Sequence, residues 1–558
     1  MLFAQSNTIS LSGASNNMPE PLTEALDKQP LSSELSTMLL LLAMSLSLTL
    51  LATGCSYWLN HPMLIYCDQG LFVSMAQLLL EGRIPYVDMF DVNPPLAIYF
   101  QVIPVLVSKY WHIPIPLSFS MYIYALAFVS CLLSGWVLLA ARKYGALLLG
   151  LCALVAFAYF NQVQRLDFGQ REHIFCIVYA PFFFLRYLRW EGFKLGRYQA
   201  IAVGLFAGVG LAFKPHFMIM ACAPEIVWWL RTRKWRPLLA PEVLAAVAVI
   251  VLYLFHFIFL PAQELKAFFQ FVVPIYKEGY SYYVTSPIYN MATCWRTDFF
   301  LLALTSVGAL ALARYSSLAP AACAFSFISA LIYVLAGQVW SCHMVAVRLG
   351  NAMAVGVELF LLYQLLPASL VGEKLKGTAM AALAVGIVGG GYYLHTACER
   401  DAQKKRDSQP YDLAQLGYTG MGSAADIDPF AASCLENTQK SDTILFICAS
   451  MAPGYPVMLQ TERRPASRFL HGMMLPILSY ILVRPDLSQA KKDHFSEDKD
   501  QVIKWYAEDI AKNRPKLIYI QDNPMNWVFE NYNFIDSYMH NYRMIDKKDG
   551  ISIYKRND

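Results

Sequence analysis

The feature that most constrains this chain is a series of long apolar runs separated by short polar loops. Of its 558 residues, 57% are hydrophobic and 15% are charged, whereas about 25% of the residues in a soluble domain are charged. Runs of this length and composition are typical of membrane-spanning helices, so we predict a polytopic α-helical membrane protein. The runs lie near residues 38–58, 94–110, 117–140, 146–160, 174–190, 198–213, 217–230, 241–260, 297–313, 318–336, 349–366 and 378–396.

Short basic clusters fall between these runs, at residues 142–143, 186–197, 231–236, 314 and 374–376. The positive-inside rule places each cluster in the cytoplasm, and the two runs between one cluster and the next supply the two crossings that this requires. The net charge is only +4, and the basic residues form no continuous stripe. Both observations argue against a nucleic-acid partner.

The segment that follows "NPP" at residues 93–95 departs from this pattern. Three runs precede the first basic cluster, although only two can cross if the N-terminal tail is cytoplasmic. The run at 94–110 is the shortest of the three and opens with two prolines, which cannot donate backbone hydrogen bonds. We therefore predict that residues 94–116 lie at the outer membrane interface or dip into it. This leaves about eleven spans and places the C-terminal domain outside.

The composition divides the rest of the chain into distinct parts. Residues 1–36 are polar, and we predict a disordered cytoplasmic tail. Residues 37–396 form the predicted transmembrane catalytic domain, whose outer loop at 59–116 carries interfacial helices. The first run lacks a basic leader and a cleavage site, so it is expected to remain as a span. The runs at 198–213 and 217–230 are short for complete crossings, at about 1.5 Å per residue.

Residues 397–558 alternate between strand-like and helix-like stretches. "DTILFICAS" and "PKLIYIQD" indicate buried strands, "DKDQVIKWYAEDIAKN" an amphipathic helix and "YRMIDKKDGISIYKR" a closing hairpin. We predict a small α/β domain. The loop after its first strand carries Arg463, Arg464 and Arg468, which either contact an anionic acceptor or lipid headgroups or are plain surface charge.

The predicted topology gathers polar and ionisable side chains on the outer side of the membrane. Such residues at span ends are costly unless they pair or serve a function, so a cluster of them on one face is a candidate site. Each could instead cap a helix or lie in headgroup water, but their convergence favours a site. The candidates are Asp68, Asp88, Asp91, Asn93, Asp167, Arg171, Glu172, His173, Lys214, His216, His343 and Arg348.

Three short motifs resemble those of GT-C-type glycosyltransferases, which use polyprenyl-phosphate sugars. With Asp68 before it, "FDVNPPL" resembles the Phe-Asp-x-His-Pro-Pro-Leu of protein O-mannosyltransferases and the His-Pro-Pro-Leu of lipid A aminoarabinose transferases. "RLDFGQREH" falls where the class places a second acid. "LAFKPHF" resembles the Leu-Thr-Lys-Gly segment of the aminoarabinose transferases, whose Lys meets the lipid phosphate. The resemblance covers roughly residues 38–260.

The resemblance implies a glycosyltransferase of the bacterial inner membrane, with its active site and C-terminal α/β domain in the periplasm. Its partners would be a polyprenyl-phosphate sugar donor, membrane lipids, and a glycan, lipid or protein acceptor. The displacement would be direct and would invert the anomeric centre. The motifs identify neither the sugar nor the acceptor.

Sugar transfer from a polyprenyl phosphate requires a base for the acceptor hydroxyl and a cation for the departing phosphate. Asp68 is the predicted base, with Asp167 or Glu172 orienting the acceptor or adjusting the pKa of the base. Lys214 is the first choice for the phosphate, because a cation at the outer end of a span reaches headgroup depth. The alternative for Lys214 is snorkelling at a helix end. The remaining predicted substrate-binding residues are Asp88, Asp91, Asn93, Arg171, His173, His216, His343 and Arg348.

The motifs depart from the family in ways that weaken the case for a metal ion. The first-loop acid is often followed by Glu in these families, but here Gln69 follows it, and Asn93 replaces the His before Pro-Pro. A hard cation needs several oxygen ligands, so we expect metal-independent transfer, although a divalent cation is compatible with the sequence. No cofactor is firmly implied. We expect the three histidines to be hydrogen-bonded structural groups rather than metal ligands.

Two other function classes stay open. A polysaccharide ligase or polymerase that uses a diphosphate-linked glycan would favour a large outer loop in mid-chain, whereas the outer mass predicted here is C-terminal. A non-enzymatic transporter would favour repeated halves and interrupted spans with charges at the membrane midplane. The sequence shows no such repeat, and its acids lie at span ends.

Overall fold

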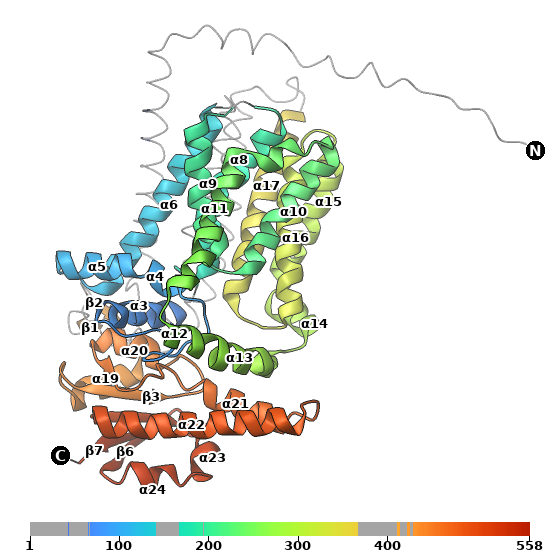
Figure 1. Ribbon diagram of the computed structural model, residues 1–558. Coiled ribbons are helices and arrows are strands. Elements are labelled where there is room, and N and C mark those ends of the chain that lie inside the picture. Colours follow the sequence, from blue (N-terminus) through green and yellow to red (C-terminus); the bar gives the residue numbers. More distant parts are fainter. Residues whose placement is uncertain are drawn as a thin grey trace, which may run out of the picture.

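The protein is described by a computed structural model that places residues 67–140, 167–193, 195–365 and 428–557, with isolated positions at 39, 43, 65, 410–412 and 421–423. The predicted tail and the runs at 38–58, 146–160 and 378–396 lie outside these residues, apart from two isolated positions. The described residues form a helical bundle and a C-terminal sheet domain (Figure 1). The helical class and the C-terminal α/β domain are therefore confirmed, whereas the count of about eleven spans stays a prediction.

Apolar helices lie side by side to form the bundle (Figure 1). Three described segments are long and apolar enough to cross a membrane: Ile115–Val137, Pro241–Phe259 and Leu318–Ala336. Two bundle helices, α10 and α11, begin with a proline, which has no N–H and fits the first helical position. The bundle comprises α6 (Ile115–Ala140), α8 (Arg171–Trp190), α9 (Arg197–Ala212), α10 (Pro215–Thr232), α11 (Pro241–His256), α15 (Arg296–Leu312), α16 (Leu318–Ala336) and α17 (Val345–Leu365).

The helix α8 lies at the centre of the bundle. All of its residues except Arg189 are buried, including Arg171 and Glu172 at one end and Arg186 near the other. It contacts α6, α9, α10 and α17. Ionisable side chains enclosed in this way need partners, so the two ends of α8 are where polar contacts must be found.

Helices α4 (Leu96–Phe100) and α5 (Val102–Trp111) lie across the end of the bundle rather than along it (Figure 1). The side chains of Tyr110 and Trp111 on α5 are 72% and 65% exposed. Large amphipathic rings of this kind are enriched at membrane interfaces. The orientation agrees with the prediction that residues 94–116 are interfacial, which itself stays a prediction.

Short helices join the bundle to the C-terminal domain. Helix α3 (Cys67–Leu80) packs on α20 (Gly454–Thr461) of that domain. A Cβ atom at Gly70 would lie 3.2 Å from the side chains of Leu459 and Tyr455, so a larger residue here would force these side chains to shift by a few tenths of an ångström. Helix α13 (Val273–Gly279) and η5 (Tyr280–Tyr283) contact α21 (Met474–Val483) of that domain. The remaining short elements are η2 (Arg236–Leu239), which joins α10 to α11, η3 (Phe257–Phe259), α12 (Ala262–Lys266), η4 (Ala267–Val272), α14 (Pro287–Tyr289), η6 (Asn290–Cys294) and η7 (Ser341–Met344).

The C-terminal domain is built on a five-stranded sheet with the order β4-β3-β5-β7-β6. The predicted buried strands are β3 (Thr443–Ile447) and β5 (Leu517–Gln521), which pair in parallel. The predicted hairpin is β6 (Tyr542–Lys548) and β7 (Ile551–Arg556), and the predicted amphipathic helix is α22 (Gln489–Asn513). The remaining elements are β1 (Pro410–Asp412), β2 (Met421–Ser423), α19 (Pro429–Asn437), β4 (Arg464–Pro465), α21 (Met474–Val483), α23 (Met525–Glu530) and α24 (Phe534–Tyr538).

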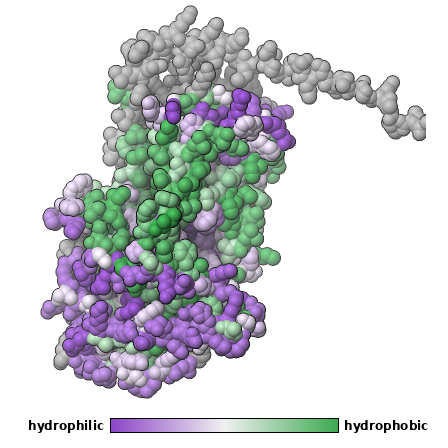
Figure 2. Space-filling view, in the orientation of Figure 1, coloured by the Kyte–Doolittle hydropathy of each residue, from purple (hydrophilic) through white to green (hydrophobic). Residues whose placement is uncertain are grey.

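The surface differs sharply between these two parts. Figure 2 shows hydrophobic residues covering the visible side of the bundle and hydrophilic residues covering the C-terminal domain. On the bundle, Leu252 and Leu310 are 67% and 78% exposed. Exposed apolar residues over so large an area mark a surface that contacts lipid. The bundle therefore lies in a membrane, and the C-terminal domain is its water-facing part.

Candidate active site

Asp68 in the first turn of α3 faces Arg171 at the beginning of α8. The Nη2 of Arg171 donates a hydrogen bond to Oδ2 of Asp68 at 2.8 Å, and the side chains are 9% and 19% exposed. Burial raises the pKa of Asp68, although the charge of Arg171 opposes the shift. A carboxylate with a raised pKa that still meets solvent is suited to accept a proton.

The loop "DVNPP" brings Asn93 to the same guanidinium. The Nη1 of Arg171 donates to Oδ1 of Asn93. Asn93 donates in turn to Oδ2 of Asp91 through its backbone N–H, at 3.1 Å, and through Nδ2, at 2.9 Å. Burial alone would raise the pKa of Asp91, but His471, Asn93 and the charge of Arg171 together lower it. Asp91 is 1% exposed, so it shapes the loop and holds Asn93 in place.

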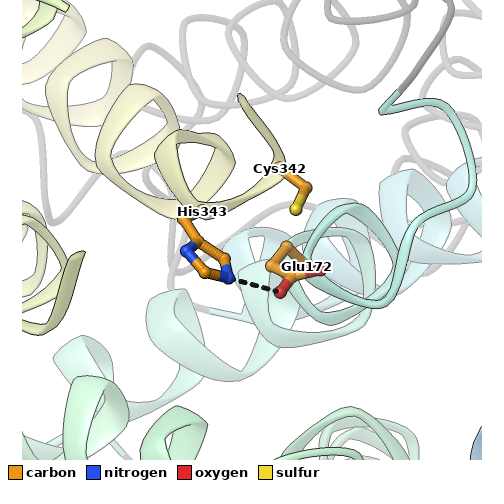
Figure 3. A group of neighbouring side chains, drawn as sticks. All are labelled: Glu172, Cys342 and His343. Carbon is orange, nitrogen blue, oxygen red and sulfur yellow. Dashed lines mark ion pairs between the residues drawn. The ribbon is translucent and has the colours of Figure 1, made fainter. Parts of the chain in front are cut away.

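A second ion pair lies beside the first. Glu172, the neighbour of Arg171, accepts a hydrogen bond at Oε1 from Nζ of Lys214, the residue before α10. The Nε2 of His343 lies 4.0 Å from the same oxygen, as the dashed line in Figure 3 shows. Burial and the charge of Lys214 lower the pKa of His343 to about 3, which keeps the imidazole neutral at physiological pH.

Glu172, Cys342 and His343 could together hold a metal ion. One ligand atom from each lies within 4.8 Å of the others, and Figure 3 shows the three side chains converging between α8 and η7. A carboxylate, a thiol and an imidazole suit zinc better than magnesium, which prefers oxygen ligands throughout. The carboxylate already pairs with Lys214, whose charge would repel a cation. The residues therefore fit a cation poorly while Lys214 stays charged.

Asp167 lies in the turn before α8 and contacts Ser341, the residue before Cys342. It is 2% exposed, and its Oδ1 accepts a hydrogen bond from Oγ of Ser341 at 2.7 Å. Burial raises the pKa of Asp167 to about 6, against the opposing effects of Ser341 and Arg348. The side chain can therefore take up or release a proton near neutral pH.

The other predicted residues have contacts of their own around this cluster. Oδ2 of Asp88 accepts from the backbone N–H of Ile84 at 2.9 Å and so stabilises a turn. Nδ1 of His173 accepts from the backbone N–H of Gly169 at 3.0 Å, which makes it a hydrogen-bonded structural group. Arg348 pairs with Asp298 at 3.2 Å. His216, in the first turn of α10, lies next to Lys214 and contacts the ring of Phe217.

The three arginines of the C-terminal loop all have partners. Arg463 is buried and donates to the side chain and carbonyl of Thr438. Arg464 pairs with Glu81 at 2.8 Å, and Arg468 pairs with Asp509 at 2.9 Å. These contacts hold the domain together and fix it to α3, so the interpretation of Arg463 as a surface residue was wrong.

Several buried polar atoms around the ion pairs have no hydrogen-bond partner in the described part of the chain. Such atoms are rare in folded proteins, because each costs about 1–3 kcal/mol, and they point to a ligand or water. His471 is among these residues and comes from the C-terminal domain, where no sequence pattern marked it. The atoms are Oδ1 of Asp91, Oδ2 of Asp167, Nε of Arg171, Oε2 of Glu172, Nδ1 of His343 and Nε2 of His471.

No protein-family model and no curated protein matches this chain. Solved structures do match. ArnT from Cupriavidus metallidurans, bound to undecaprenyl phosphate, is 11% identical with a TM-score of 0.51, over 92% of this chain and 97% of ArnT. The chain has a GT-C-type fold. The fold implied by the resemblance of "FDVNPPL", "RLDFGQREH" and "LAFKPHF" is thereby confirmed.

A second similar structure is the oligosaccharyltransferase of Archaeoglobus fulgidus, tethered to an acceptor peptide. It is 12% identical with a TM-score of 0.43, over 92% of this chain and 74% of that protein. In this structure the acid-bearing loop, the start of α8 and the start of α10 meet at one end of the bundle. A structural match at such low sequence identity shows the fold alone. The chemistry must be argued from the residues of this chain.

Proposed function

We propose that this protein is an integral-membrane glycosyltransferase that transfers a sugar from a polyprenyl-phosphate donor to an acceptor hydroxyl. The observation that carries the proposal is the pair of adjacent contacts, Asp68 with Arg171 and Glu172 with Lys214, buried together at one end of a GT-C bundle. One supplies a base and the other a cation, as this reaction requires. ArnT, which has the same fold, was solved with undecaprenyl phosphate bound.

Asp68 is the proposed base. The acceptor hydroxyl loses its proton to the Asp68 carboxylate as its oxygen attacks the anomeric carbon, and the bond from that carbon to the phosphate oxygen breaks. The electron pair leaves with the polyprenyl phosphate, so charge and atoms balance and the anomeric centre inverts. Burial raises the pKa of Asp68, which makes it a stronger base, while Arg171 fixes its orientation.

Lys214 is the proposed phosphate-binding cation. Its ammonium group has three N–H donors, and Glu172 accepts only one of them among the described contacts. A phosphate that approaches Lys214 would receive the others without displacing Glu172. Lys214 stands at the junction of α9 and α10, where the bundle meets the water-facing domain. A lipid phosphate at headgroup depth can reach this position while its prenyl chain stays in the bilayer.

The location of the reaction follows from the predicted topology. The basic clusters support a topology with the site and the C-terminal domain on the outer face, and the proposed location is the periplasmic side of a bacterial inner membrane. The proposed acceptors are a glycan, a lipid or a protein. Asp167 and the loop that carries Asp91 and Asn93 would orient the substrates around the base.

The direct test compares glycans and glycolipids by mass spectrometry in cells with and without this chain. We expect a sugar modification that depends on the wild-type protein and is lost with Asp68→Asn, which keeps the shape of the side chain but removes the base. Asp536→Asn, an exposed position on the C-terminal domain, is the matched control and should retain the modification. If Asp68→Asn reaches the membrane and transfers sugar normally, Asp68 is not the base.

A further inference from the structure

The C-terminal domain reaches into the candidate site through the segment that precedes the Pro-Pro motif. The backbone N–H of Phe90 donates to the carbonyl of Arg468 at 2.7 Å, and Phe90 forms a parallel bridge with Phe469. The ring of Phe90 stacks on Phe469 and Trp505, with centroids 5.0 and 5.3 Å apart. The sheet domain therefore holds the acid-bearing loop by backbone and side chain together.

His471 follows two residues after this bridge and faces Asp91. The Nε2 of His471 lies 3.7 Å from Oδ1 of Asp91, and the residues are 5% and 1% exposed. Neither atom has a hydrogen-bond partner within the described residues. Two complementary buried atoms that face each other just beyond hydrogen-bond distance need a shift of only a few tenths of an ångström to bond.

The backbone fixes which nitrogen of His471 carries the proton. The N–H of Met473 points at Nδ1 of His471 at 3.4 Å, so Nδ1 acts as the acceptor. In the neutral imidazole the proton must then lie on Nε2, the atom that faces Asp91. His471 can therefore donate to Asp91 as a neutral imidazole.

The contact continues from Asp91 to the proposed base. The other oxygen of Asp91 accepts from Asn93, Asn93 accepts from Arg171, and Arg171 donates to Asp68. Each step is a side-chain hydrogen bond between residues with little exposure, and the ionisable groups that act on Asp91 along it are His471 and Arg171. A displacement of Asp91 would therefore move the guanidinium that orients the base.

We propose that His471 is a positioning residue supplied by the C-terminal domain, which holds Asp91 and, through Asn93 and Arg171, sets the orientation of Asp68. This rests on the proposed function of Asp68. The contact between His471 and Asp91 closes into a hydrogen bond when a polyprenyl phosphate occupies the site. A phosphate held by Lys214 lies beside Arg171, whose buried Nε has no hydrogen-bond partner among the described residues, and so orders the loop attached to Arg171. The C-terminal domain is thus part of the catalytic apparatus rather than an appendage.

Hydrogen exchange in the full-length protein tests the closure without knowledge of the sugar. The protein is placed in lipid nanodiscs, and the amides of residues 86–93 are followed before and after addition of undecaprenyl phosphate. We expect the ligand to slow exchange at these amides in the wild type and in His471→Gln, whose side-chain amide can replace the Nε2 donor. In His471→Ala the ligand should still bind but should not protect this segment.

Sugar transfer in cells provides the second measurement. Loss of a buried hydrogen bond to a charged group should lower transfer by His471→Ala about 10- to 100-fold, with His471→Gln retaining most of it. His540→Ala, at an exposed position of the same domain, controls for loss of a histidine. In an Asp91→Asn background, His471→Ala should cause little further loss, because both act through one contact.

The outcomes separate this proposal from the proposed function. If the wild type does not bind undecaprenyl phosphate, the donor assignment fails. If it binds the lipid but His471→Ala shows normal protection of residues 86–93 and normal transfer, the role of His471 is overturned. If His471→Ala and His471→Gln lose activity equally and add fully to Asp91→Asn, His471 does not act through Asp91.

Discussion

The two ends of α8 carry buried clusters of charged residues, which differ in how many of their polar atoms have hydrogen-bond partners. Near one end, Arg186 donates to both oxygens of Glu225 at 2.7 Å and to Glu242 at 2.8 Å. Arg189 donates to both oxygens of Glu242 at 3.0 Å, and Trp190 donates to Glu225 at 2.8 Å. At the other end, Arg171 and Glu172 each make an ion pair but keep a buried atom without a hydrogen bond.

The difference separates a structural network from a site. Burial of charge is tolerated when every donor and acceptor is paired, and no atom of Arg186, Glu225 or Glu242 belongs to the buried unpaired set among the described residues. The network near Arg186 therefore fixes α8, α10 and α11 to one another. The cluster at Arg171 keeps unused hydrogen-bonding capacity, which a substrate can satisfy.

The largest expected effects come from replacing Arg186 or Arg171 of α8 by methionine. Arg186→Met leaves Glu225 and Glu242 as buried charges with fewer partners, which should lower stability by about 3–5 kcal/mol. Arg171→Met should abolish transfer with a smaller loss of stability, because Asp68 is 19% exposed and can be solvated. Thermal unfolding in detergent micelles and transfer in cells measure the two effects.

The distinction between a structural network and a site would be wrong if the two variants behaved alike. An equal decrease in the melting temperature of both variants would show that the cluster at Arg171 is structural as well. An active, stable Arg186→Met protein would remove the structural role of the far network.

The next prediction concerns the cation of the site. Lys214→Met should reduce transfer about 100- to 1,000-fold, the range seen when a single charge-stabilising donor is removed from an active site. Its binding of undecaprenyl phosphate should weaken as well. Arg189→Met is the matched control, because it also removes a cation, at the far end of α8, where the side chain is 20% exposed. This variant should leave lipid binding intact. Unchanged binding in Lys214→Met would reassign the phosphate contact to Arg171.

Much of the fold could be predicted from the sequence, because the signals are local. The strands Thr443–Ile447 and Leu517–Gln521 follow from apolar runs bounded by turn residues. The convergence of Asp68, Arg171 and Lys214 was predicted from their common side of the membrane, and the structure brings all three together. The side of the membrane on which a loop lies is predicted from the distribution of Lys and Arg along the chain, and this requires no knowledge of tertiary contacts.

The pairings themselves could not be predicted, because they join residues far apart in sequence. His471 meets Asp91 only because the sheet domain packs on the acid-bearing loop, and nothing near His471 marks it. Arg348 was predicted at the site, where its charge acts on Asp167, but its ion pair with Asp298 depends on how α15 and α17 pack. Side-chain pairing between helices depends on their packing, which local patterns do not encode.

A smaller effect should follow from the proton of Asp167. Because burial raises its pKa to about 6, above the ordinary value of about 3.9, the native state favours the protonated form. Its contribution to stability is present below about pH 4 and is lost as pH rises through 6. Asp167→Asn should therefore be about 2–3 kcal/mol more stable than the wild type at pH 7.5 and equally stable near pH 4. The same difference in unfolding free energy between Asp167→Asn and the wild type at both pH values would contradict this prediction.

The smallest expected effect belongs to Ser341→Ala. Its hydroxyl donates to Asp167 and lowers the pKa of that carboxyl, so its loss should raise the pKa further and cost about 1 kcal/mol of stability at pH 7.5. Below pH 4 the cost should be smaller, because a protonated carboxyl needs the donor less. Transfer should fall only a few-fold, with the shift visible as a displaced pH profile. An unshifted profile would show that Asp167 does not titrate during the reaction, and would confine the working charges of the site to the two ion pairs on α8.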